Sequence, residues 1–391
     1  MDAPKKRNLL ILYTKNTAEV YNRKSAIGSY VFCLAQLLQK DFNVFINGAI
    51  IDETKNTSGD ESNKASFSKK IKNLVPKRIK GFIRDKSHFK NLKKLCDSIL
   101  NSAIHYDEIL EFYNFGSNVG NNISTHQNCR LHLIYDGPIF EEYYFFNGYH
   151  SFFKRKSENR LKASFNRASN IVVYSDPMKK HCIENIDPDN SKYKIHQNID
   201  FSRFKFITKE KPTDCLNICF IGSFLKWHNV DFLINAFDEI SKNKSGLPLK
   251  LFLIGDGMEK KRMETLVEEL ENPDIIFTGY LDGDELTRLQ EKMHIGIMPG
   301  SNWYGAPNKI FEYGAMGMAC IAPSTPTIEY IFKDSEVSFF ELNNFASFKL
   351  KLNQLVTNQN LILELSKRLN QFTKENYSSE KTKIFYINFL N

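Results

Sequence analysis

The chain has 391 residues, of which 42% are hydrophobic and 25% are charged. Such numbers are ordinary for a globular protein, and the length suits two domains better than one. No apolar run approaches the roughly 20 residues needed to cross a bilayer, and the seven cysteines lack paired spacing. Length and composition therefore argue against an integral membrane protein and against a small disulfide-stabilised scaffold.

The first fifty residues predict a strand, a helix and a second strand. Asn8–Tyr13 is typical of a buried strand, residues 14–26 form a polar loop, and Gly28 opens a helix with apolar positions at helical spacing. Phe42–Ile46 is the second strand. The apolar run after the basic amino terminus is too short for a signal peptide, so we expect a cytosolic protein. The loop lacks the sequence GxGxxG, which argues against a nicotinamide dinucleotide site.

The net charge of +8 is concentrated in one segment. Lys64–Lys94 holds ten lysines and two arginines against a single acidic residue, so the rest of the chain is slightly acidic. Apolar side chains alternate with these cations on both sides of Pro76, a pattern that suits an amphipathic helix on an anionic membrane surface. Ordinary packing against its own domain and nucleic-acid binding are alternatives, although no nucleic-acid recognition motif is present.

Two later strands of the first half end in polar residues. Asp107–Phe112 is followed by Tyr113 and Asn114, and Leu131–Tyr135 is followed by Asp136. Because ligands bind at the carboxyl ends of parallel strands, these ends are candidate acceptor sites. Asp136 is suited to bind hydroxyl groups or to act as a base. The Asp-Gly-Pro sequence is equally good turn chemistry, so a purely structural role is the alternative.

A second α/β region follows a segment of linker composition, TKEKPT, and we place the domain boundary between residues 207 and 208. Leu216–Ile221 predicts its first strand, followed by Gly222 and a helix from Val230. A strand, a glycine turn and a helix form an anion-binding geometry, in which Gly222 lets the backbone approach a diphosphate. Lys226 is the local cation. His228 either contacts phosphate or sugar or has a structural role.

The stretch from residue 300 to residue 323, GSNWYGAPNKIFEYGAMGMACIAP, predicts a loop, a short helix and a strand. Pro307 suits the first turn of the helix. The amino end of that helix carries a partial positive charge, and Lys309 adds a full one, so a phosphate would bind there. Glu312 lies about one turn further and can accept hydrogen bonds from sugar hydroxyls. A capped core helix of any α/β protein is the alternative.

This stretch resembles a known family. The spacing Pro307-x-Lys309-x-Phe311-Glu312-Tyr313-x-Ala315-x-Gly317 is similar to the P-x-K-x-F-E-Y-M-A-x-G sequence of the family-4 retaining glycosyltransferases. Their fuller signature is E-x7-E. Glu312 matches the second glutamate, whereas Tyr304 replaces the first. The similarity extends over nearly all of the second domain and over the first only in outline.

The resemblance implies a fold and a domain organisation. The fold is α/β of the GT-B type, with two Rossmann-like doubly wound domains facing across a cleft. Residues 1–207 are then the acceptor-binding domain and residues 208–376 the nucleotide-sugar domain. A terminal helix, residues 377–391, is expected to pack back on the first domain.

The resemblance also implies roles for individual residues. Asp136, Lys309 and Glu312 are the candidate catalytic residues, and Gly28, Tyr113, Asn114 and Asp136 the candidate acceptor-binding residues. No metal ion and no cofactor apart from the donor substrate is expected. The candidate donor-binding residues lie in four loops and one helix start: Gly222, Ser223, Lys226, His228, Gly255, Gly257, Gly279, Tyr280, Leu281, Tyr304, Gly305, Ala306, Pro307, Asn308, Lys309, Ile310 and Glu312.

The activity implied is transfer of a hexose from a nucleotide-diphosphate sugar, in UDP or GDP form, to a hydroxyl group with retained anomeric configuration. Together with the basic segment, the resemblance suggests that the acceptor is a lipid-linked saccharide. It also suggests a protein at the inner face of the cell membrane with a role in cell-surface polysaccharide synthesis. We expect no nucleic-acid partner. The alternatives are a sugar-nucleotide epimerase of the same fold and a catalytically silent nucleotide- or sugar-binding subunit.

Overall fold

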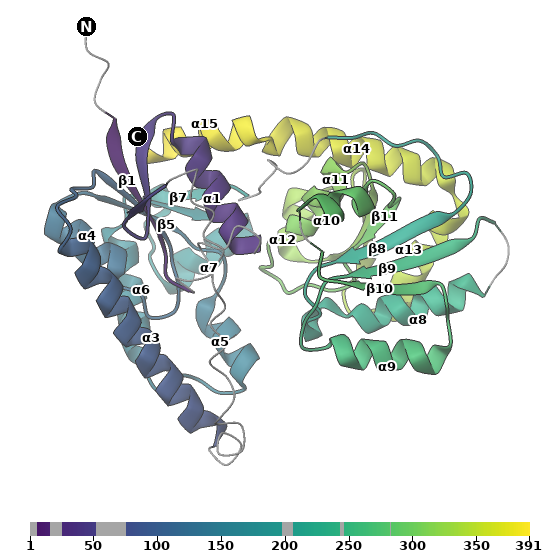
Figure 1. Ribbon diagram of the computed structural model, residues 1–391, viewed down its shortest axis with the longest axis horizontal. Helices are drawn as coiled ribbons and strands as arrows, with labels where there is room; N and C mark the ends of the chain where they lie inside the picture. Colours follow the sequence, from purple (N-terminus) through teal and green to yellow (C-terminus); the bar gives the residue numbers. More distant parts are fainter. Residues whose placement is uncertain (1–5, 16–25, 52–75, 198–205, 243–245, 282) are drawn as a thin grey trace, which may run out of the picture. The chain divides into compact units, whose positions relative to one another are not determined.

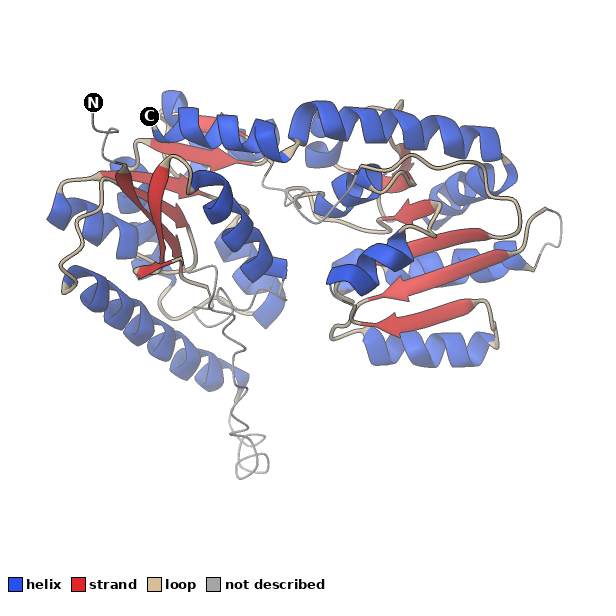
Figure 2. Cartoon of the chain, turned by 45° about the horizontal axis from the view of Figure 1, so that its top comes forward, coloured by secondary structure: helices blue, strands red, loops and turns tan. Residues whose placement is uncertain are grey.

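The computed structural model describes residues 6–15, 26–51, 76–197, 206–242, 246–281 and 283–391. The chain divides into two compact units, each built on its own parallel sheet (Figures 1 and 2). Unit 1 comprises Met1–Asn198 and Lys383–Asn391, and unit 2 comprises Ile199–Thr382.

Unit 1 contains a seven-stranded sheet of order β3-β2-β1-β4-β5-β6-β7. All its pairings are parallel except that of β2 with β3. The interior strand β1 is fully buried from Leu9 to Leu12, as expected for a strand covered on both faces. The strands are β1 (Arg7–Tyr13), β2 (Phe42–Ile46), β3 (Ala49–Ile50), β4 (Glu108–Phe112), β5 (Arg130–Ile134), β6 (Asn170–Val173) and β7 (Tyr193–Ile195).

The helices of unit 1 follow the strands in the order expected for a doubly wound domain. They are α1 (Ala26–Leu38), α3 (Lys77–Leu100), α4 (Val119–Gln127), α5 (Ile139–Asn147), α6 (Lys154–Arg167) and α7 (Asp176–Asn185), with a 3-10 turn at Asn190–Lys192. The helix expected to open at Gly28 begins at Ala26, so Gly28 lies inside its first turn. Of the basic segment, residues 64–75 lie outside the described residues. The remainder begins α3 directly after Pro76, whose fixed φ suits a helix start.

Unit 2 contains a six-stranded, all-parallel sheet of order β10-β9-β8-β11-β12-β13. The chain adds strands on one side of β8 and then returns to its other side with β11, so the strand order reverses between these two neighbours. The strands are β8 (Leu216–Ile221), β9 (Leu249–Ile254), β10 (Ile275–Gly279), β11 (Ile295–Ile297), β12 (Ala319–Ser324) and β13 (Ser338–Glu341).

Two apolar cores, one containing Phe237 and the other Phe311, are built on this sheet and its helices. Alternate residues of β8 belong to different cores: Phe220 to the first, Cys219 and Ile221 to the second. The helices are α8 (Val230–Ser241), α9 (Lys260–Leu270), α10 (Gly283–Gln290), α11 (Asn308–Ala315), α12 (Pro326–Ile331), α13 (Phe345–Thr357) and α14 (Gln359–Tyr377), with a 3-10 turn at Lys226–His228.

The division between the units falls at Asn198/Ile199, earlier than the boundary expected between residues 207 and 208. Residues 206 and 207 belong to unit 2 because they pack on its second core. The Ile207 N–H donates to the Ala315 carbonyl oxygen over 3.0 Å, and the Asn370 side chain donates to the Ile207 carbonyl oxygen over 3.1 Å. Polar composition alone did not reveal that this segment is hydrogen-bonded to the second domain.

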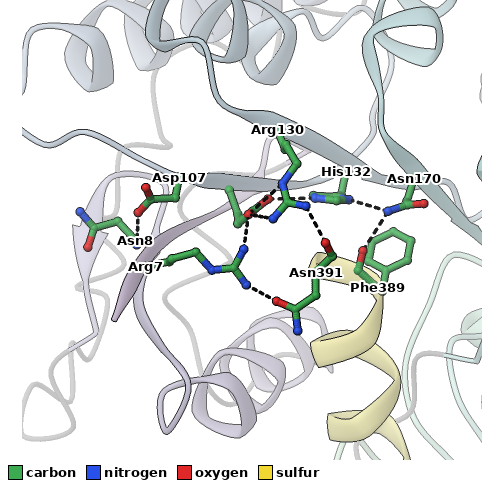
Figure 3. Close-up of polar contacts among 9 residues, drawn as sticks. Arg7, Asn8, Asp107, Arg130, His132, Asn170, Phe389 and Asn391 are labelled. Atoms are coloured by element: carbon green, nitrogen blue, oxygen red, sulfur yellow. Dashed lines mark hydrogen bonds and ion pairs between the residues drawn. The ribbon is translucent and has the colours of Figure 1, made fainter. Parts of the chain in front are cut away.

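The last helix, α15 (Ser379–Leu390), returns the chain to unit 1, where its end meets the amino edge of the sheet (Figure 3). Buried Glu108 at the start of β4 is the centre of this contact. It accepts from Arg7 over 2.7 Å, from Arg130, and from the His132 ring over 3.0 Å. Arg130 also donates to the Asn391 backbone oxygen over 2.7 Å. The carboxylate therefore organises both the sheet edge and the contact with α15.

Candidate functional site

The carboxyl edge of the unit 2 sheet is built from glycine turns packed against one another. A Cβ atom added at Gly255, after β9, would lie 2.1 Å from the carbonyl oxygen of Gly222, after β8. One added at Gly257 would lie 2.5 Å from the Phe224 nitrogen, and one at Gly300 would lie 2.3 Å from the Trp227 carbonyl oxygen. Only residues without a side chain allow the three loops to approach this closely.

Lys309, the second residue of α11, extends its side chain onto these turns. Its Nζ lies 3.3 Å from Nε2 of His228 and 5.7 Å from the centre of the Phe220 ring. A Cβ at Gly222 would meet the Lys309 Cε at 2.4 Å, so the glycine is required for the lysine to lie there. The loop after β8 and the helix after β11 thus meet where the strand order reverses, which is the usual ligand site of an open parallel sheet.

Buried His228 fixes the charge arrangement around Lys309. Its Nδ1 lies 2.5 Å from the Ser223 carbonyl oxygen, which can only accept, so Nδ1 carries the proton and Nε2 presents a lone pair to Lys309. Burial and the nearby Lys309 charge lower the pKa of His228 to about 3, so the imidazole is neutral at pH 7.

Burial also lowers the pKa of Lys309, to about 8, while Glu312 acts to raise it. Lys309 is therefore mainly protonated at pH 7. Its polar partner among the described residues is a neutral imidazole rather than a carboxylate, so its positive charge remains available to a ligand. A partly buried ammonium group of this kind favours an anion.

The start of α11 lies beside this cation. Pro307 precedes the first helical residue, Asn308, and provides no side-chain cap. Pro307 is thus the N-cap residue instead of lying in the first turn. The half-buried Glu312, one turn further, is close enough for its charge to act on Lys309. A helix amino terminus, a lysine and a carboxylate are therefore combined as the sequence predicted, in an arrangement that suits phosphate followed by hydroxyl groups.

Tyr313 and Gly296 support this edge of the sheet, a role that was not predicted from the sequence. The Tyr313 hydroxyl accepts from the Ile221 N–H over 3.2 Å and donates to the Ile297 carbonyl oxygen over 3.2 Å, so it joins β8 to β11. Its ring packs on Gly296, where an added Cβ would lie 2.3 Å away. A glycine inside a short buried strand is a signal of such a close approach.

The remaining candidate donor residues differ in their placement. Gly279 ends β10 and its carbonyl oxygen accepts from the Gly255 N–H over 2.9 Å, so it joins the glycine turns. Tyr280 is 59% exposed, and the Ser223 and Lys226 side chains are also exposed. Leu281 is half-buried. The side chains of Ser223, Lys226, Tyr280 and Leu281 lie at the surface or near it.

The loop before α11 is mainly packed inward. Tyr304 is buried and its ring centre lies 5.3 Å from that of Trp303, while Gly305 lies against Ser301 and Asn302. Ala306 is half-buried and Asn308 is exposed. The Ile310 side chain is fully buried in the apolar core, and its N–H already donates to Pro307. The prediction that Ile310 binds the donor is therefore wrong for its side chain, because an apolar residue at this helix position faces the core.

At the carboxyl edge of the unit 1 sheet, the strand register brings two candidates together. Phe112 of β4 pairs with Ile134 of β5, so Asn114 and Asp136 lie at equivalent positions beyond the paired strands. The Asp136 side chain is exposed and that of Asn114 is partly exposed. Both remain accessible to a ligand.

Tyr113 does not belong with these residues, and its predicted role in acceptor binding is wrong. Its side chain is 3% exposed and its hydroxyl donates to the Ser117 carbonyl oxygen over 3.1 Å. Its ring lies 6.3 Å from Phe165 and 6.4 Å from Tyr135, centre to centre. The alternation of side chains along the strand turns Tyr113 into the aromatic core. Gly28, the remaining acceptor candidate, lies in the first turn of α1.

Among the described residues, no group of three or more histidine, cysteine, aspartate or glutamate side chains is arranged to hold a metal ion. None of the helices in the described parts of the chain has the length and apolar character needed to cross a bilayer.

The chain is similar to glycosyltransferases in sequence. Residues 201–376 match the family model described as "Glycosyl transferases group 1". An uncharacterised glycosyltransferase of Methanocaldococcus jannaschii, MJ1069, is 24% identical over 238 residues. That match spans 59% of this chain and 60% of the relative's length.

Solved structures show the same architecture. HepE of Anabaena, crystallised with UDP, superposes with a TM-score of 0.69 at 12% identity, covering 98% of this chain and 99% of the other. Sucrose-phosphate synthase of Thermosynechococcus elongatus gives a TM-score of 0.72 at 14% identity and covers 98% of each chain. At these identities the likeness shows the fold, which is GT-B.

Proposed function

We propose that the protein is a retaining glycosyltransferase, because residues 201–376 match the glycosyl transferases group 1 family model and the fold is GT-B. It moves a hexose from a nucleotide-diphosphate sugar to a hydroxyl group of a saccharide acceptor. The observation that carries the proposal is the cation at the strand reversal, where Lys309 lies on the Gly222 turn with His228 as its neutral neighbour.

The chemistry follows from where charge develops. When the sugar leaves, negative charge accumulates on the diphosphate, and Lys309 with the amino end of α11 stabilises it. The glycine turns let backbone groups reach the phosphates. No enzymic nucleophile is needed, because the departing phosphate can take the proton of the acceptor hydroxyl. The Lys309 ammonium and the glycine turns after β8 and β9 therefore bind the transition state, in which the diphosphate carries more negative charge, more strongly than the ground state.

Glu312 and the loop after β10 complete the donor site in this proposal. The Glu312 carboxylate accepts hydrogen bonds from ribose hydroxyls, and Gly279–Leu281 borders the base. HepE, with the same fold, was crystallised with UDP and with UDP-glucose, which makes UDP the first nucleotide to test. The reaction is proposed to need neither a metal ion nor another cofactor.

The acceptor is proposed to bind at the carboxyl edge of the unit 1 sheet, where exposed Asp136 and partly exposed Asn114 follow neighbouring strands at equivalent positions. Asp136 orients the attacking hydroxyl. Exposed Ile79, Phe82 and Ile83 on the cationic helix α3 suit contact with an anionic bilayer. The working proposal is therefore that the acceptor is a lipid-linked saccharide. The enzyme would act at the inner face of the membrane, in the synthesis of a cell-surface polysaccharide.

Thermal unfolding with UDP, GDP and ADP tests the donor site. A nucleotide at 100 times its dissociation constant stabilises the folded protein by about 2.7 kcal/mol. We expect a clear shift of the melting temperature with one diphosphate, and its loss in Glu312→Ala. If none of the three nucleotides shifts the melting temperature, the donor-site assignment is contradicted.

Product analysis separates the transferase from its rivals. A transferase consumes nucleotide sugar in proportion to added saccharide acceptor. An epimerase converts or hydrolyses the donor without acceptor. A silent nucleotide- or sugar-binding subunit shows the melting shift but no turnover, so the two measurements together distinguish all three.

A further inference from the structure

Helices α3, α4 and α6 of unit 1 enclose a second candidate site, far along the chain from the donor residues. Between them lies a pocket of about 760 Å³. Lys86, Lys90 and Lys93 line it from α3, and Lys156 and Arg160 line it from α6. Figure 1 shows α3 running along α4 in unit 1. We propose that this α3–α6 pocket binds an acidic oligosaccharide, one that carries carboxylate, phosphate or sulfate groups along its sugar rings.

The described lining of the pocket carries a net positive charge. Among the described lining residues, Asp97 is the one acidic side chain. Within the described ranges, none of the five lining cations forms an ion pair with a carboxylate, although ion pairs occur nearby at Lys154–Glu158 and Arg84–Asp85. Five cations around one cavity repel one another, and a polyanion relieves this repulsion when it binds.

The two cations that α6 contributes to the pocket, Lys156 and Arg160, are held in place by contacts within the protein. The Phe89 ring lies beneath two cations, with its centre 4.8 Å from the Arg160 guanidinium carbon and 5.1 Å from Lys156 Nζ. Arg160 is further held because it donates to the Gly116 carbonyl oxygen over 2.7 Å. Side chains already held in place lose little freedom on binding, which favours a specific site over diffuse attraction.

Helix α3 is itself anchored by a buried carboxylate. Asp85 accepts from the Tyr143 hydroxyl of α5 and from the Ser151 hydroxyl, each over 2.6 Å. The lysines of α3 are therefore presented from an attached helix, at defined positions relative to the loop before α6.

Size and polar lining favour a saccharide. An adjoining hollow of about 470 Å³ shares Asn118, Lys156 and Arg160 with the first pocket. Pockets of this order accommodate ligands larger than one sugar ring. Asn118 and Asn122 add amide groups that can both donate to and accept from hydroxyls. Cations for acidic groups and amides for hydroxyls together match an acidic oligosaccharide. If the chain is a glycosyltransferase as proposed, this ligand is a remote part of its acceptor, but binding does not depend on that reaction.

Titration calorimetry of the full-length protein at 0.15 M salt tests the proposal, with a sulfated heparin-type pentasaccharide as the acidic probe. Neutral maltopentaose serves as the uncharged probe. We expect the acidic probe to bind at least tenfold more tightly than the neutral one. The double variant Lys90→Ala/Lys156→Ala should weaken its binding at least tenfold, with the melting temperature and the UDP-induced melting shift unchanged.

The matched control is Lys94→Ala/Lys162→Ala. It removes two exposed lysines from the same two helices, and neither of them lines the pocket. The control should bind the acidic probe within twofold of the parent protein. Equal losses in the two double variants would show diffuse charge attraction and would overturn the proposal.

Two further probes test whether the pocket instead binds a membrane surface or nucleic acid. Vesicles containing phosphatidylglycerol, compared with phosphatidylcholine alone, report on a membrane surface. A single-stranded oligonucleotide of similar charge reports on nucleic acid. If either depends on Lys90 and Lys156 while the pentasaccharide does not bind, the saccharide assignment is wrong. If loss of UDP binding is instead found with intact pentasaccharide binding, the donor site fails and the α3–α6 pocket stands.

Discussion

The molecule buries ionic groups at two sheet edges, and the two edges differ in how their charge is satisfied. At the amino edge of the unit 1 sheet, buried Glu108 is surrounded by Arg7, Arg130 and His132. At the carboxyl edge of unit 2, Lys309 meets a neutral imidazole. The first arrangement is complete within the protein, whereas the second has a cation that a ligand can still neutralise.

The His132 and His228 rings show the same difference in detail. His132 accepts at Nδ1 from Asn170 over 3.4 Å and so donates from Nε2 to Glu108. His228 donates from Nδ1 to a carbonyl oxygen and so offers a lone pair at Nε2. The backbone and amide partners thus select opposite tautomers. Burial of an ionisable group alone is therefore a weak mark of function, and an unneutralised charge is a better one.

The largest effect is expected from Lys309→Met, which keeps most of the side-chain volume and removes the charge. We expect kcat/KM with the nucleotide sugar to fall by roughly 10²- to 10³-fold, as when one group that stabilises a developing anion is lost. Steady-state kinetics measure this. Lys261→Met, at an exposed position of α9, is the control. A loss of less than threefold at Lys309 would mean that the cation does not serve the reaction.

Glu108→Ala tests how much the ion cluster around Glu108 contributes to stability. The change leaves two arginines and a buried histidine without their shared acceptor, which costs about 3 kcal/mol of unfolding free energy, at the low end for a broken buried pair because both arginines are partly exposed. Urea unfolding measures this loss. Glu184→Ala, exposed on α7, should change stability by less than about 0.5 kcal/mol. The UDP-induced melting shift should survive, and its disappearance would contradict a purely structural role.

A smaller effect is expected from pH. Burial lowers the pKa of Lys309 to about 8, and a bound diphosphate favours its protonated form. Affinity for the nucleoside diphosphate should therefore be highest below pH 8 and decrease above it, by up to about tenfold per pH unit. Calorimetry at pH 7.5 and pH 9 measures the change, with proton uptake on binding near pH 8. A Lys309→Met protein should lack this slope. The same slope in that variant would assign the titration to another group.

Much of the candidate donor site was predictable because its signals are local in sequence. Lys309 and Glu312 are one helical turn apart, and Gly222 and Gly255 directly follow β8 and β9, so their place at one sheet edge follows from a parallel topology. The errors have physical causes. Tyr113 and Ile310 stand next to candidate site residues in the sequence, but the direction of their side chains along a strand or helix places them in the core.

By itself, the sequence indicated two α/β domains, most of their strands and helices, and the cation and carboxylate of α11. Hydrophobic periodicity, glycine turns and a short motif carry that information because each depends on neighbours within a few residues. The tertiary structure decided the tautomer and charge of His228 and the ion pairs of Glu108 with Arg7 and Arg130. It also brought the cations of α3 and α6 together around one pocket. These features join residues far apart in the chain, so they exist only once the sheets and helices have packed.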